Sequence, residues 1–130
     1  MKTIIITAAV TALVGGAALA QDVPEYMKET YPGYAVGEAL GLMGALEGEK
    51  AAIDAKTMQL IQLGVAAQIP CVYCVYYHTK AAKAAGASQD EIKAAIAAAA
   101  DTRMWSTVLN GNAYDFDAFK AEVDAFMKTN

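Results

Sequence analysis

Both cysteines of the chain and its only histidine lie within residues 71–78, in the segment Cys71-Val-Tyr-Cys74-Val-Tyr-Tyr-His78. On a helix, these positions are spaced i, i+3 and i+7, so the three side chains share one face. A cysteine thiolate is a nucleophile, and the N–H groups and dipole of a helix N-terminus favour it over the thiol. A histidine one turn after Cys74 can accept the thiol proton, and the second cysteine can resolve an oxidised first one as a disulfide. The segment therefore indicates thiol-based redox chemistry.

Three other interpretations of the cysteine pair stay open at this point. The pair could form a structural disulfide, although so short a loop contributes little stability. It could be half of a zinc site completed by water or another subunit. It could also consist of buried, unreactive thiols. Covalent haem attachment is excluded because it needs a histidine directly after the second cysteine, and Val75 occupies that position.

The elements that must position these residues are predicted to be helices. Pro70 suits the first turn of a helix over about 70–85, which Gly86 ends in the left-handed conformation. Asp54 is the expected cap of a mostly buried helix over 55–68, and Ser88 opens a longer one through a capping box with Glu91. No run of β-branched residues alternates with period two. We predict an all-α chain of about six helices.

Gln59 is a polar residue in the mostly apolar stretch 55–68. A helix hairpin with its turn near residues 69–70 would bring Gln59 beside the cysteines. Trp105 and three methionines are expected in the core, namely Met43, Met58 and Met104. Because alanine-rich helices bury little surface each, a chain of this length is expected to form oligomers.

Residues 1–20 have the features of a bacterial secretory signal peptide, with Lys2, an apolar run and a small-residue cleavage site at Ala18–Ala20. The mature protein, residues 21–130, is then a single domain in the periplasm or outside the cell, where disulfides persist. No later segment is a better membrane anchor. With 10 basic against 14 acidic residues and a net charge of −4, the chain lacks the basic footprint of a nucleic-acid binder.

The stretch 59–95 resembles the core of the carboxymuconolactone decarboxylase and alkylhydroperoxidase D family. The matching features are the apolar helix, Cys-x-x-Cys-x-x-x-His, Gly86 and the turn at residues 90–92. The resemblance implies a single-domain alkylhydroperoxidase D-like helical bundle, with the family core at about 55–100, in symmetric oligomers that are often trimers or hexamers. In the peroxidase branch it implies Cys74 as the peroxidatic cysteine, Cys71 as the resolving cysteine and His78 in the proton relay. The glutamate that this branch carries twelve residues before the first cysteine is Gln59 here.

We therefore predict an exported thiol-dependent peroxidase that reduces alkyl hydroperoxides, with no cofactor or metal and with an unidentified thiol reductant as partner. Gln59 can orient a proton donor but cannot take up a proton, so a carboxylate would have to come from Glu38, Glu47 or Glu49. The alternatives are a thiol–disulfide oxidoreductase of the same fold and a non-enzymatic oligomeric protein whose cysteines are structural.

Overall fold

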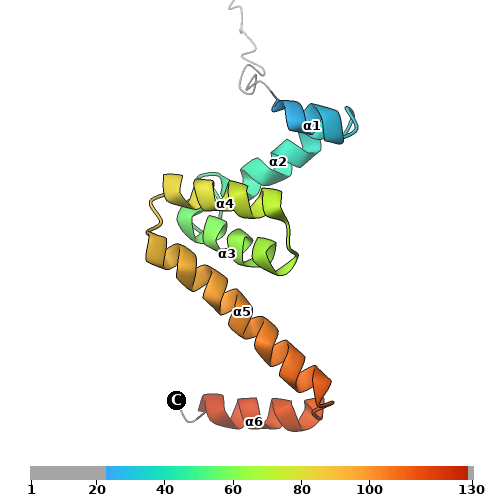
Figure 1. Ribbon diagram of the computed structural model, residues 1–130, viewed down its shortest axis with the longest axis vertical. Coiled ribbons are helices and arrows are strands. Elements are labelled where there is room, and N and C mark those ends of the chain that lie inside the picture. The colour runs from blue at the N-terminus through green and yellow to red at the C-terminus, as the bar shows by residue number, and fades with distance from the viewer. Residues whose placement is uncertain (1–22, 129–130) are drawn as a thin grey trace, which may run out of the picture. The chain divides into compact units, whose positions relative to one another are not determined.

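The computed structural model describes residues 23–128, and the predicted signal peptide lies outside them. All regular secondary structure in this range is helical, which confirms the predicted all-α class (Figure 1). The helices are α1 (Glu25–Thr30), α2 (Val36–Glu47), α3 (Ala55–Gln68), α4 (Val72–Ala84), α5 (Gln89–Gly111) and α6 (Phe116–Lys128).

The chain divides after Gly41 into two units, which are described separately. In the first, Pro24 is the N-cap of α1, and Glu25 in the first turn pairs with Lys28 at 3.1 Å. Met27 is the buried residue of this short helix. The helix ends before Pro32, as a proline-glycine pair predicts.

In the second unit, α3 and α4 form a helical hairpin, and α5 packs on α3 (Figure 1). Asp54 caps α3 as predicted, because its Oδ1 accepts the Thr57 N–H at 3.0 Å. The core consists of one buried side chain from each of the three helices, namely Leu63, Ala82 and Ile92. This small core fixes the positions of α3 and α4, which carry the predicted site residues.

Two features of the α4–α5 connection hold α5 against α3. Gly86 adopts the left-handed conformation with φ +87°, and Ser88 and Glu91 form the predicted capping box. Glu91 also accepts a hydrogen bond from Lys56 of α3 at 2.7 Å. Farther along, Gly64 faces α5, and a Cβ built there would lie in ordinary van der Waals contact, 3.5 Å from the Ala95 carbonyl oxygen.

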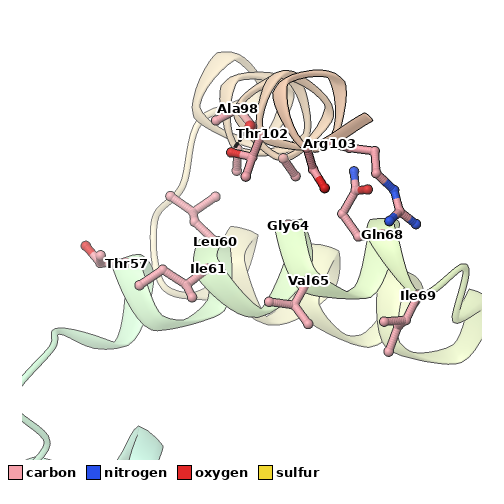
Figure 2. A pocket seen from close by; sticks show the side chains of 13 residues that line it. Thr57, Leu60, Ile61, Gly64, Val65, Gln68, Ile69, Ala98, Thr102 and Arg103 are labelled. Carbon is pink, nitrogen blue, oxygen red and sulfur yellow. Dashed lines mark hydrogen bonds between the residues drawn. The ribbon is translucent and has the colours of Figure 1, made fainter. Parts of the chain in front are cut away.

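The prediction that α3 is mostly buried is wrong for one of its faces. Ile61 is 48% exposed and Val65 56% exposed, and both line an open, largely apolar groove of about 690 Å³ between α3 and α5. Figure 2 shows this groove, with Leu60 and Ile61 on the α3 side and Thr102 on the α5 side. The apolar pattern marks this face correctly as hydrophobic, but no segment of residues 23–128 covers it.

The distal part of α5 and most of α6 are also exposed. Trp105 is 53% exposed and Met104 50% exposed, so the prediction that they belong to the core is wrong. Asp115 caps α6 by accepting the Ala118 N–H at 2.7 Å. No residue of α6 is buried. Between residues 23 and 128, no helix combines the length and apolar character needed to span a bilayer.

Candidate functional site

The cysteine pair lies at the start of α4, where Cys71 is the N-cap residue and Cys74 lies in the first turn. The prediction that Pro70 occupies the first helical turn is wrong, because Pro70 precedes the N-cap and α4 begins at Val72. The physical reason is that the Cys71 sulfur itself caps the helix. The Cys74 N–H donates to Cys71 Sγ at 3.2 Å, so a sulfur replaces the usual oxygen acceptor.

The two cysteines form a disulfide, with their Cα atoms 5.3 Å apart. Both residues are partly exposed. The interpretation as buried, unreactive thiols is therefore wrong, whereas a redox-active pair and a structural disulfide both agree with the bond. No group of three or more His, Cys, Asp or Glu side chains within residues 23–128 could hold a metal ion, so nothing there supports the zinc interpretation.

A hollow of about 420 Å³ lies beside the disulfide, between the end of α3 and one side of α4. Cys71 lines it, whereas Cys74 and His78 do not. Its walls are mainly apolar, with Thr79 and Lys80 as the polar contributors. Of the two cysteines, Cys71 is thus the one that faces a space where a small molecule or a partner's side chain could approach.

His78 and Gln59 meet across the α3–α4 hairpin, although they are 19 residues apart. His78 Nδ1 lies 2.8 Å from Gln59 Oε1, and Gln59 is 4% exposed. An amide oxygen can only accept a hydrogen bond, so Nδ1 carries the proton and donates it. In the neutral ring, Nε2 is then left with its lone pair, which makes it the proton acceptor. The sequence suggested that Gln59 lies near the cysteines, and the structure gives it His78 as its direct partner.

Burial lowers the pKa of His78 below its usual value, and the negative charge of Glu47 partly opposes this by raising it. The Tyr77 ring packs edge-on against the imidazole, with the ring centroids 5.1 Å apart. With a lowered pKa, the imidazole is neutral at neutral pH. The neutral imidazole can therefore accept a proton, and it does not carry a permanent positive charge.

Glu47, at the end of α2, is the carboxylate whose negative charge acts on the pKa of His78. Its Oε1 is buried and finds no hydrogen-bond partner in the described part of the chain. The sequence offered Glu38, Glu47 and Glu49 as sources of a carboxylate, and nothing in their spacing separated them. The distinguishing fact is tertiary, because only Glu47 acts on the His78 pKa.

These features define a helical protein with a disulfide at the start of one helix, and with a buried glutamine that contacts a partly buried histidine one turn after the second cysteine. The sequence matches the carboxymuconolactone decarboxylase family over residues 35–115, more than half of the chain, so the protein belongs to that family. The match confirms the resemblance seen in residues 59–95 and extends it into both flanks. No curated protein and no solved structure matches the chain.

Proposed function

We propose that the protein is an exported thiol-dependent peroxidase that reduces alkyl hydroperoxides through Cys71 and Cys74. The observation that carries the proposal is the Gln59–His78 hydrogen bond on the same helix hairpin as the disulfide. This bond leaves Nε2 of a neutral imidazole as a base, one helical turn from Cys74. A purely structural disulfide would not require a tautomer-fixed histidine nearby. Family membership supports an enzyme of this kind.

The reaction begins with the reduced pair. His78 takes the proton of the Cys74 thiol, and the thiolate attacks one oxygen of the hydroperoxide, so that the O–O bond breaks. Cys74 becomes a sulfenic acid, and the departing alkoxide takes a proton to leave as an alcohol. The Cys71 sulfur then attacks the sulfenic sulfur, which forms the disulfide and releases water. The disulfide of the structure is the oxidised end of this cycle.

A thiol reductant from outside the chain closes the cycle. Its thiolate attacks one sulfur of the disulfide, and two reductant thiols in all are oxidised to a disulfide as both cysteines return to thiols. Attack on Cys74 expels the Cys71 thiolate at the helix N-cap, where the Cys74 N–H already points at that sulfur. The N-cap contact therefore favours Cys71 as the leaving group during re-reduction.

The same proposal includes export to the periplasm or beyond, and assembly into oligomers. The apolar groove between α3 and α5 is the surface that a second copy would cover, because few apolar residues between 23 and 128 are buried while Ile61 and Val65 stay exposed. Ala98 lines the groove, whereas its exposed neighbour Ala97 does not. Ala98→Lys should lower the mass measured by light scattering, and Ala97→Lys should leave it unchanged. Equal masses for both variants and the parent would argue against this interface.

The deciding experiment counts free thiols in pre-reduced protein before and after one equivalent of an organic hydroperoxide. Cys71→Ser and Cys74→Ser variants are treated alongside. We expect rapid loss of both thiols in the parent. The Cys71→Ser variant, which retains Cys74, should still consume peroxide once, and the Cys74→Ser variant should not. No thiol loss over minutes would contradict the peroxidase proposal.

A thiol–disulfide oxidoreductase is the second candidate function, and a specific observation favours it. Cys71, not Cys74, lines the hollow beside α4 and sits at the N-cap, where a thiolate is stabilised. Rapid exchange with a small disulfide that depends on Cys71, together with no peroxide consumption, would support this function. Resistance of the disulfide to mild reductant would instead favour a non-enzymatic protein.

A further inference from the structure

One oxygen of the half-buried Glu47 carboxylate, Oε1, has no role in the fold that the described residues explain. This oxygen is shielded from solvent, yet it neither accepts a hydrogen bond nor forms an ion pair in residues 23–128. A carboxylate oxygen that is shielded from water and accepts no hydrogen bond is unfavourable, because it loses its hydration and gains no protein partner in exchange. A carboxylate with an unpartnered oxygen whose charge acts on a titratable imidazole is a recurrent feature of functional sites.

We propose that Glu47 is a positioning residue for His78. Glu47 supplies the negative charge that stabilises the imidazolium formed when His78 takes the thiol proton. The proposal rests on the proposed function. It divides the work between two side chains: Gln59 holds Nδ1–H and so selects the tautomer, and Glu47 supplies the charge. Glu47 acts through the electrostatic field rather than by direct contact, and His78 remains the residue that touches the proton.

The surroundings of His78 leave Glu47 as the relevant charge. The group that faces the imidazole from α3 is the uncharged Gln59. Lys56 of α3 and Glu91 of α5 are occupied with each other at 2.7 Å. On α4 itself, the ring neighbour is Tyr77. Of the charged groups in the described residues, Glu47 alone acts on the pKa of His78, and it raises that pKa against the effect of burial.

The direct test uses the fact that the chain has a single histidine. In oxidised protein without a histidine tag, the Cε1–H resonance of His78 is followed by NMR as the pH is varied. Glu47→Gln should lower the pKa of His78, because it removes the charge but keeps the shape. The matched control is Glu49→Gln, the same change two residues along, which should leave the pKa where it was. In the double variant Glu47→Gln/Gln59→Glu, the pKa should rise again, because a carboxylate then contacts Nδ1 directly.

The second readout is the rate of peroxide-driven thiol loss. Near neutral pH, Glu47→Gln should reduce this rate by about threefold to tenfold, as expected for one nearby charge at a partly exposed site. The pH profile should shift in the same direction as the His78 pKa. Glu49→Gln should change neither the rate nor the profile.

An unchanged His78 pKa in a folded Glu47→Gln variant would overturn the proposal. If Glu47→Gln fails to fold, Glu47→Asp replaces it, since aspartate keeps the charge but withdraws it by one carbon. A smaller decrease in the pKa is then expected, and no decrease would again overturn the proposal. A lowered pKa in a protein that consumes no peroxide would refute the proposed function while leaving the coupling of Glu47 to His78 intact.

Discussion

Replacing Gln59 by leucine tests whether the hydrogen bond to His78 sets the tautomer of the imidazole. The change removes the acceptor that lies 2.8 Å from Nδ1 and leaves a side chain of similar size in a site that is 4% exposed in the parent. Losing the bond while its donor stays partly buried costs about 1–3 kcal/mol. Burying an additional apolar group returns about 1.5–3 kcal/mol. The two terms nearly cancel, so we expect the free energy of unfolding to change by about 1 kcal/mol or less.

The effect on the imidazole should be much larger than the effect on stability. Without an acceptor at Nδ1, the proton is free to move to Nε2, and the ring then lacks its base at the position the parent uses. General-base catalysis contributes about 10²–10⁴ in rate, so the peroxide-driven rate should fall by about 10-fold to 100-fold. Gln59→Glu should act in the opposite direction, because a carboxylate strengthens the bond and favours the imidazolium.

The assay is long-range proton–nitrogen NMR of the histidine ring, which distinguishes protonated from unprotonated nitrogen, combined with chemical denaturation. Gln62→Leu is the matched control, since Gln62 lies on the same helix and its buried Oε1 has no hydrogen-bond partner among the described residues. That variant should keep the tautomer and the rate of the parent. A parent protein whose proton sits on Nε2 would refute the reasoning, as would a Gln59→Leu variant with the parent's tautomer and rate.

Three further predictions concern the core, the acid side of the stability curve and the base. Leu63→Ala removes the fully buried side chain that packs in the core formed by α3, α4 and α5. It should lower the free energy of unfolding, measured by chemical denaturation, by about 2–5 kcal/mol. The hydrogen bond from Lys56, with those from Ser88, lowers the pKa of Glu91 from 4.5 to about 2. Because the folded pKa is depressed, its stabilising effect is present above about pH 4.5 and disappears as the pH falls towards 2, so the stability difference between parent and Glu91→Gln should vanish over that window. His78→Ala should slow alkylation of the reduced cysteines near neutral pH, and an alkylation profile identical to the parent's would make His78 structural.

Local chemistry explains why the helices could be predicted so closely from the sequence. The bounds 55–68 of α3 match the prediction, because Asp54 supplies a cap and the chain turns before Pro70. The capping box at Ser88 likewise fixes where α5 begins. Helix α4 begins after Cys71 rather than at Pro70, where the sequence predicted it to begin, because Cys71 caps the helix in place of the usual oxygen-bearing side chain. Each of these signals is contained in a few adjacent residues.

Exposure could not be predicted in the same way, because it depends on what covers a surface. The apolar spacing of Ile61 and Val65 identifies a hydrophobic face on α3 but carries no information on its partner. The same holds for Trp105 on α5. Alanine-rich helices leave only a small core within one chain, so apolar residues that would be buried in a larger domain stay at the surface.

At the site, too, the sequence identifies the residues, whereas their partners depend on tertiary structure. These partners distinguish this chain from the peroxidase branch that it resembles. There, a glutamate on the equivalent of α3 can both accept the histidine N–H and supply a negative charge. Here Gln59 retains the acceptor and loses the charge, while Glu47 contributes a charge from another helix without a hydrogen bond. If these are separable functions, restoring the charge at position 59 should make Glu47 dispensable, so Glu47→Gln should slow peroxide reduction in the parent but have little effect in a Gln59→Glu background. Equal losses in the two backgrounds would mean that Glu47 serves the fold and not the imidazole.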